Sequence, residues 1–199
     1  ILSIEPSPLD KNIIWVGTDD GNVQLTVNSG KTWKNLSNKI YGAPKGSWVP
    51  QIVASTYDPG TAVVIMNNYR QNDWAPYIFQ TKNYGKSWKS LADEKDIWGH
   101  VLSYVQDPIE TNLQFIGTEY GLYVTIDGAE NWTKWTNGFP TVSTMDLKIH
   151  PREHDLIIGT FGRAAYILDD IRPLRELASI NQNLLDQRLH FFEPPTAVL

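Results

Sequence analysis

The sequence predicts an all-β fold, a β-propeller with about four blades, each a four-stranded antiparallel sheet. Three observations support this prediction: a turn motif that recurs three times, a Gly-Thr motif that recurs out of phase with it, and short β-branched and aromatic runs bounded by tight turns. Repeats of roughly 40 to 50 residues with four strands each are typical of propeller blades. A helical period is present only weakly, at 173–178.

Both motifs can be read directly from the sequence. The turn motif is T-V-N-S-G-K-T-W at 26–33, T-K-N-Y-G-K-S-W at 81–88 and T-I-D-G-A-E-N-W at 125–132. The second motif is V-G-T at 16–18, I-G-T at 116–118 and I-G-T at 158–160. A module without the Gly-Thr pair fits between its first two copies. Because one unit is copied along the chain, the repeat decides the predicted fold.

This register places the blades in residues 1–178, as four modules at about 1–37, 49–92, 101–136 and 145–177. Each module reads as four strands joined by turns. In the second module the expected strands are 49–55, 61–67, 77–81 and 87–91. The repeat then stops, and 179–199 is expected to be a crossing segment that packs on the propeller, with Leu189, Phe191 and Phe192 covering an exposed apolar patch.

The residues of the repeated turn have structural explanations. We expect an Asp or Asn side chain to accept backbone N–H bonds, a glycine to adopt a positive φ, and a tryptophan ring to fold against the blade. These residues are Asn28, Gly30, Trp33, Asn83, Gly85, Trp88, Asp127 and Trp132. A site should occur once, whereas this motif recurs, so a structural role is favoured over catalysis. In the third copy Ala129 replaces the glycine and Asn131 the hydroxyl residue, which predicts a looser turn.

Composition excludes several classes of function. A net charge of -5 and a pI near 5.3 argue against a nucleic-acid partner, because affinity for phosphates comes from Lys and Arg. No apolar run approaches the roughly 20 residues that a membrane span needs. With no Cys and four His that form no metal-ligand spacing, we expect no metal site and no cofactor.

The repeated turn resembles that of the Asp-box propellers, also called bacterial neuraminidase repeats, and within them the sortilin-like and xyloglucanase-like proteins of bacteria. The likeness is most specific at 14–21, 115–122 and 150–156, and 162–174 resembles the end of the last propeller in large secreted bacterial proteins. The resemblance implies that these are C-terminal blades of a larger ring, which supplies further blades as partners. It also implies a secreted or periplasmic location, although the chain opens with no signal segment. A complete four-bladed ring is the alternative.

The resemblance further implies that the turns between second and third strands share one face with the connections between blades. That face should hold Asp19, Asp20, the loop 68–74, Trp48, Trp98, His100, Glu119, Tyr120, Phe161 and Arg163. We expect the ligand-binding residues to be Trp48, Arg70, Trp74, Tyr120 and Arg163. The loop 68–74 is longer than a hairpin needs, and such loops often bind ligands. Asp20 and Glu119 also suit ordinary hairpin turns, and Arg163 could instead pair with Asp169 or Asp170.

These residues favour a non-catalytic binding or scaffold module that recognises a glycan or a protein through this face. The alternative is a glycoside hydrolase, which needs two carboxylates roughly 5 to 10 Å apart. The candidate carboxylates are Asp20, Asp73 and Glu119, and nothing in their spacing singles out a pair. Sialidase activity has little support, because Arg70 and Arg163 are the only arginines expected on this face.

Overall fold

The computed structural model describes residues 1–180 and 188–194. Four antiparallel sheets follow one another along the chain, and in each the strand order is the chain order. The first sheet contains β1 (Ser3–Pro6), β2 (Ile14–Gly17), β3 (Val23–Thr26) and β4 (Lys34–Asn35). The second contains β5 (Trp48–Ala54), β6 (Ala62–Asn68), β7 (Asp73–Thr81) and β8 (Lys89–Ser90).

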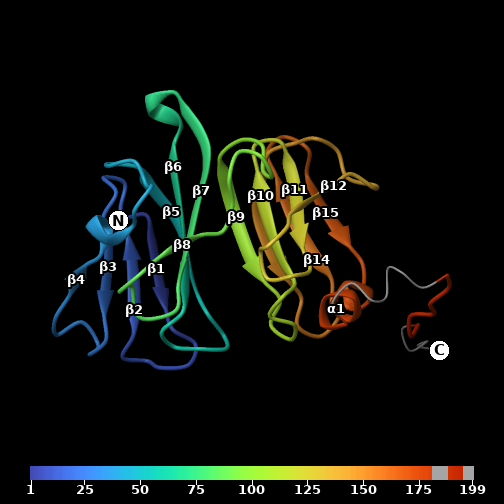
Figure 1. The fold of residues 1–199 in the computed structure, drawn as a ribbon, viewed down its shortest axis with the longest axis horizontal. Helices are drawn as coiled ribbons and strands as arrows, with labels where there is room; N and C mark the ends of the chain where they lie inside the picture. The colour runs from blue at the N-terminus through green and yellow to red at the C-terminus, as the bar shows by residue number, and fades with distance from the viewer. Residues whose placement is uncertain (181–187, 195–199) are drawn as a thin grey trace.

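The remaining elements complete the arrangement. The third sheet contains β9 (Val101–Gln106), β10 (Gln114–Thr118), β11 (Gly121–Thr125) and β12 (Thr133–Trp135). The fourth contains β13 (Thr144–Ile149), β14 (Leu156–Thr160) and β15 (Ala165–Leu168). Outside the sheets are the 3-10 turns η1 (Ser37–Lys39) and η2 (Tyr69–Gln71) and the helix α1 (Arg172–Ser179). Figure 1 shows the sheets in succession, with α1 at the end opposite the β6–β7 hairpin.

The fourth sheet differs from the predicted module, because it has three strands within the described residues. The chain enters α1 instead of a fourth strand, and Pro173 lies in the first turn of that helix. Proline suits this position, since its φ is already helical and its missing N–H would have no partner there. The weak helical signal at 173–178 is therefore confirmed.

The second sheet corrects another expectation. Residues 68–74 are not a long loop, because β6 continues to Asn68 and β7 begins at Asp73, with only the η2 turn between them. Asn72 closes this turn with φ 59°, a conformation that Asn tolerates better than most residues. The result is a β-hairpin that projects past the neighbouring sheets (Figure 1).

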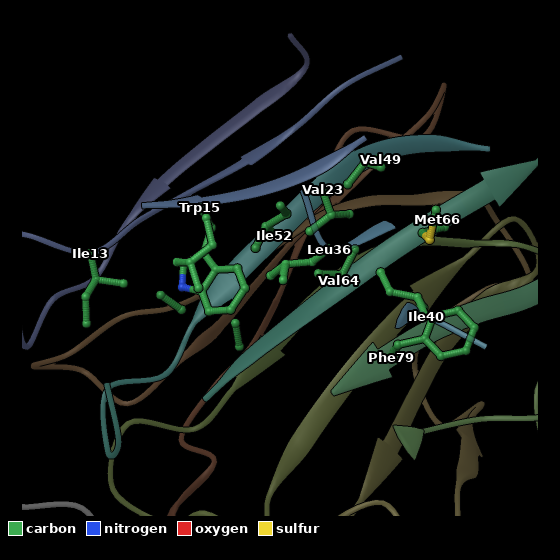
Figure 2. Packing of buried hydrophobic residues seen from close by; sticks show 13 residues of the cluster. Ile13, Trp15, Val23, Leu36, Ile40, Val49, Ile52, Val64, Met66 and Phe79 are labelled. Atoms are coloured by element: carbon green, nitrogen blue, oxygen red, sulfur yellow. The ribbon is translucent and has the colours of Figure 1, made fainter. Parts of the chain in front are cut away.

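Three hydrophobic clusters fill the spaces between successive sheets. Strand β6 contributes to two of them, because successive side chains in a strand point to opposite faces. Val64 and Met66 pack toward the first sheet, where Trp15 is fully buried (Figure 2). Val63 and Ile65 pack toward the third sheet. Each sheet in the middle of the chain is thus buried on both faces, as propeller packing requires.

One side-chain-to-backbone hydrogen bond of the repeated turn is present in all three copies. The side chains of Asn28, Asn83 and Asp127 each accept the backbone N–H four residues later, at 2.9, 2.9 and 3.0 Å. In the first two copies the side-chain amide of the Asn also donates to the hydroxyl four residues later. In the third copy the direction is reversed, because the side-chain amide of Asn131 donates to the Asp127 carboxylate at 2.8 Å. The residues at 127 and 131 thus exchange the roles of donor and acceptor, and the looser turn expected here stays a prediction.

Two tryptophans of the repeated turn, Trp88 and Trp132, also contact the preceding blade. Trp88 of the second sheet meets Trp15 of the first edge-on, with ring centroids 6.3 Å apart. Trp132 of the third sheet donates its indole N–H to the Leu91 carbonyl at 2.8 Å. Trp33 of the first sheet has no preceding sheet in this chain, and 44% of it is exposed. Its ring lies over its own turn, since a Cβ on Gly30 would be 3.8 Å from it.

The turn between the first two strands of each sheet carries a capping residue at an equivalent position. Ser7 and Ser55 accept N–H bonds there in the first two sheets, and His150 accepts one in the fourth. In the third sheet the residue is Asp107, which accepts the N–H groups of residues 109 and 110, each at 2.8 Å. The other Asp107 oxygen accepts a bond from Arg175 Nε of α1, also at 2.8 Å, so this carboxylate fixes the helix to the third sheet.

The tail was expected to pack on the propeller. In the described residues 188–194, Leu189 and Phe191 are largely exposed, and His190 bonds Glu176 of α1 at 2.8 Å. The apolar patch at this end of the third and fourth sheets is covered instead by Ile171 and Ala178, which are buried. The rest of the predicted crossing segment, 181–187 and 195–199, lies outside the described residues. Among the described helices, none is long and apolar enough to cross a membrane.

Candidate binding face

Backbone hydrogen bonds separate the two faces of the molecule. On one face each repeated turn is bonded to the first turn of its own sheet, as from Ser29 N to Asn12 O at 2.9 Å. On the other, the turn after the second strand is bonded near the start of a first strand, as from Glu119 N to His100 O at 3.3 Å. The second face, called the upper face below, holds the β6–β7 hairpin and the linker between the second and third sheets.

An aromatic group on the upper face surrounds His100. Tyr69 stacks on the His100 ring at 5.5 Å between centroids, and Trp74 lies 5.5 Å from the same ring at a steeper angle. Tyr69 also meets Trp48 edge-on at 5.9 Å. Arg70 lies over the Trp48 ring, with its guanidinium carbon 3.5 Å from the ring centre. This cation–π contact is made within the chain and holds Arg70, at the tip of the hairpin, against Trp48 at the start of β5.

His100 and Glu119 form a polar pair beneath these rings. His100 Nδ1 lies 3.4 Å from Glu119 Oε2, and neither atom has a hydrogen-bond partner among the described residues. Burial lowers the pKa of His100 below its ordinary value, and the Glu119 carboxylate partly offsets this shift. The neutral imidazole is therefore favoured in the folded chain at pH 7.

Beside this pair lies an open hollow of about 630 Å³, called the aromatic hollow below. Its lining consists of Trp74, Pro76, Glu94, Ile97, Trp98, Gly99 and Tyr120. Trp74, Trp98 and Tyr120 are 45%, 71% and 41% exposed, unusually high for three neighbouring aromatic side chains. Trp98 and Tyr120 are tilted by 44° with ring centroids 5.8 Å apart.

The linker that forms one wall of the hollow is held at both ends. Leu91 and Ile97 are buried between the second and third sheets. The Tyr123 hydroxyl accepts the Trp98 N–H at 3.1 Å, which fixes the backbone beneath the exposed indole. Gly99 has φ +79°, and a Cβ there would lie 2.6 Å from the Tyr120 ring. The ring therefore packs directly over a position that only glycine fills without displacement.

Two of the three candidate catalytic carboxylates are engaged in local hydrogen bonds. Burial alone would raise the pKa of Asp73, but bonds from Asn68, Ala75 and Tyr77 outweigh it and hold the pKa below its ordinary value. A hydrogen bond from Thr18 lowers the pKa of Asp20 in the first-sheet turn. A glycosidase acid needs a raised pKa, so neither residue is suited to that role.

The structure brings some of the expected residues together and leaves others apart. Trp48, Arg70, Trp74, Trp98, His100, Glu119 and Tyr120 gather at the junction of the second and third sheets. Asp19 and Asp20 are on the turn of the first sheet. Phe161 and Arg163 are exposed on the turn of the fourth sheet.

Arg163 makes none of the expected ion pairs among the described residues. Asp170 instead accepts bonds from Arg172, at 2.6 and 2.9 Å. Within the described part of the chain, no group of three His, Asp or Glu residues could hold a metal ion. Glu94 and Ile97 were not predicted from the sequence. Ile97 could have been, because a single apolar residue between Asp96 and Trp98 indicates a linker whose side chain packs inward at that position.

Comparison with known proteins supports the fold. No protein-family model matches the chain, and no curated protein matches it. Among solved structures, YCF48 bound to D1 peptide is 14% identical over 85% of this chain and 50% of that chain, with a TM-score of 0.60. The extracellular domain of the hybrid two-component system BT4673 from B. thetaiotaomicron is 15% identical over 84% of this chain and 21% of that chain, with a TM-score of 0.59.

A GH74 enzyme from Niastella koreensis is also similar, at 15% identity over 85% of this chain and 23% of that chain, with a TM-score of 0.56. The chain thus spans half or less of the length of each of these three proteins. At such identities the likeness concerns the fold alone. Together with the successive packed sheets, it shows that this chain is an all-β protein built of β-propeller blades.

Proposed function

We propose that the chain is a non-catalytic binding module that recognises a glycan or protein ligand through the aromatic hollow of its upper face. The observation that supports this most is the exposure of Trp74, Trp98 and Tyr120 around one hollow. Aromatic rings provide large contact area with little loss of side-chain entropy, and they are frequent anchors of binding surfaces. A ligand would cover apolar surface that water covers now.

Hydrolysis is the weaker proposal. The pKa values of Asp73 and Asp20 are lowered, so neither suits the general acid that a glycosidase needs beside its ionised carboxylate. Solved propellers with this fold include both a peptide-bound protein and a GH74 enzyme, so the fold is compatible with either role. The side chains at the hollow favour binding.

A binding experiment with matched variants tests the proposal. A panel of neutral oligosaccharides and peptides is titrated into the chain, and tryptophan fluorescence and calorimetry are recorded. Trp98→Ala and Trp74→Ala should each weaken any binding about tenfold or more. Trp33→Ala is the control, because Trp33 is on the opposite face and its exposure of 44% matches the 45% of Trp74. Turnover of a glycan that Glu119→Ala abolishes would refute the non-catalytic role.

We also propose that the repeated turns are Asp-box turns and that further blades of the same kind cover the two end sheets. Residues in the third sheet that face its neighbours are buried, as Phe115 and Val124 are toward the fourth sheet. The equivalent residues of the fourth sheet, Ile157 and Ile167, are exposed. Trp33 and Ile4 are exposed on the first sheet in the same way. This pattern is that of blades whose next neighbours are absent from the chain.

A measurement of self-association tests this second proposal. With its end sheets uncovered, the chain should associate through them at micromolar concentrations in sedimentation velocity. The double change Ile157→Lys and Ile167→Lys should reduce that association, whereas Ile109→Lys, at an exposed position in a turn of the third sheet, should not. Equal association of all three proteins would contradict the proposal.

A further inference from the structure

Three hollows adjoin around the linker between the second and third sheets. The aromatic hollow, of about 630 Å³, shares Pro76 and Glu94 with a hollow of about 370 Å³ beneath the β6–β7 hairpin. It shares Glu94, Ile97 and Trp98 with a third hollow of about 320 Å³. Glu94 therefore lies where all three meet. The three hollows that adjoin at Glu94 are together called the trough below.

Acidic residues outnumber basic ones in the lining of this trough, three to two. Glu94 is the only charged residue that lines the aromatic hollow within the described part of the chain. Asp93 lines the second hollow and Asp96 the third, and both side chains are exposed. Two lysines, Lys95 and Lys134, line only the outer hollows. Arg70, the nearest arginine named on this face, is stacked on Trp48 and does not line the trough.

We infer, on the basis of the proposed binding function, that the trough binds an extended basic peptide that contains proline. The tilted Trp98 and Tyr120 rings form a ridged surface, and aromatic-lined grooves of this kind receive the three-sided polyproline II helix. Such a peptide is already extended, so little conformational entropy is lost on binding. A lysine of the peptide pairs with Glu94 and lies near an indole face, which also attracts cations.

The lining disfavours a sugar as the occupant. Sugars need several side chains that form hydrogen bonds around their stacking surface, and the aromatic hollow offers one carboxylate, two indole N–H groups and one phenol. An acidic glycan would in addition be repelled by Asp93, Glu94 and Asp96. A proline-containing peptide needs fewer hydrogen-bonding side chains from the site, because its proline rings are apolar and its backbone keeps most of its hydrogen bonds to water.

The test compares three probes on the full chain by calorimetry: a ten-residue peptide of alternating lysine and proline, the same peptide with glutamate for lysine, and a neutral cello-oligosaccharide. The lysine peptide should bind, and the glutamate peptide should bind at least tenfold more weakly. Glu94→Gln should weaken the lysine peptide about fivefold, because it removes the charge but keeps the shape. Glu130→Gln, an exposed glutamate on the repeated turn, is the control and should leave binding unchanged.

Each result bears on the inference separately from the binding function. If the oligosaccharide binds and Trp98→Ala abolishes that binding while the lysine peptide does not bind, the peptide inference fails and the binding module stands. If the lysine peptide binds equally well to Glu94→Gln and Trp98→Ala, its site is elsewhere and the inference also fails. If none of the three probes binds, the inference is overturned, and the module depends on the wider panel. Raising the salt to 0.5 M should weaken the lysine peptide but not the oligosaccharide.

Discussion

Replacing Arg175 by methionine is expected to destabilise the chain by about 3 kcal/mol, because it leaves the buried Asp107 carboxylate without its cation. Asp107 is 0% exposed, and Arg175 Nε lies 2.8 Å from one of its oxygens. Loss of one partner of a buried ion pair typically costs about 3–5 kcal/mol. We expect the lower end, because two backbone N–H groups still bind the other Asp107 oxygen. Methionine keeps the apolar volume of the arginine stem.

The chain itself supplies the matched variant. Serine occupies the position of Asp107 in the first two sheets, where Ser7 and Ser55 cap the same turn. Asp107→Ser should therefore keep the turn but leave Arg175 buried without its carboxylate, with His154 Nδ1, at 2.9 Å, as its remaining side-chain partner. The double variant Asp107→Ser with Arg175→Met removes both charges and should lose only about 1 kcal/mol, less than either single change. Such non-additivity would show that the two side chains interact with each other.

Urea unfolding followed by circular dichroism gives these differences from the midpoint and slope of each curve. The comparison requires slopes that agree among the four proteins, since a changed slope would indicate a changed unfolding reaction. Simple addition of the two single effects would show that Asp107 and Arg175 act independently. A loss below about 0.5 kcal/mol in Arg175→Met, within the range of ordinary surface changes, would refute the view that the pair fixes α1.

Three further predictions concern stability. Gly99→Ala should cost about 1–2 kcal/mol from its positive φ and should also displace Tyr120; Gly46→Ala, with φ +77° and no atom near its Cβ, is the control for strain alone. Burial lowers the pKa of His100, so its contribution to the free energy of unfolding is complete above about pH 6.5 and is lost as the pH falls through the pKa of the folded state. Between about pH 7.5 and 5, the free energy of unfolding should therefore fall more steeply for the wild type than for His100→Gln. Trp88→Ala should cost about 2–3 kcal/mol and Trp33→Ala less than 1 kcal/mol in urea, since only Trp88 meets a preceding sheet; equal costs would contradict packing on the preceding blade.

Repetition in the sequence predicts the fold well, because strands and turns depend on local residues. In the second sheet, β6 and β7 end within one residue of the expected positions. The extension of β7 back to Asp73 was missed, since the network of Asn68, Asp73 and Tyr77 that supports it requires the two strands to be paired first. The fixed position of α1 was missed for the same reason, because Asp107 and Arg175 are 68 residues apart.

The candidate site was predictable only in part. The resemblance to Asp-box propellers implies which face a turn lies on, so Trp48, Trp74, Trp98 and Tyr120 could be assigned to the upper face. It does not tell which sheets meet beneath a given side chain. Arg163 and Asp20 were therefore grouped with residues that lie at another sheet junction, and Glu94 was missed because its importance comes from three hollows that meet beside it.

The position of the aromatic hollow follows from two departures from the repeat, both at the junction of the second and third sheets. One is the projecting β6–β7 hairpin, and the other is the linker anchored by Leu91 and Ile97. Packing between these sheets is already provided by Ile65, Ile78 and Ile116, all buried, so the exposed rings above them are not needed for stability. Trp98→Ala should accordingly change the unfolding free energy by less than about 0.5 kcal/mol while it weakens binding. A large loss of stability would mean that the indole serves the fold rather than a ligand.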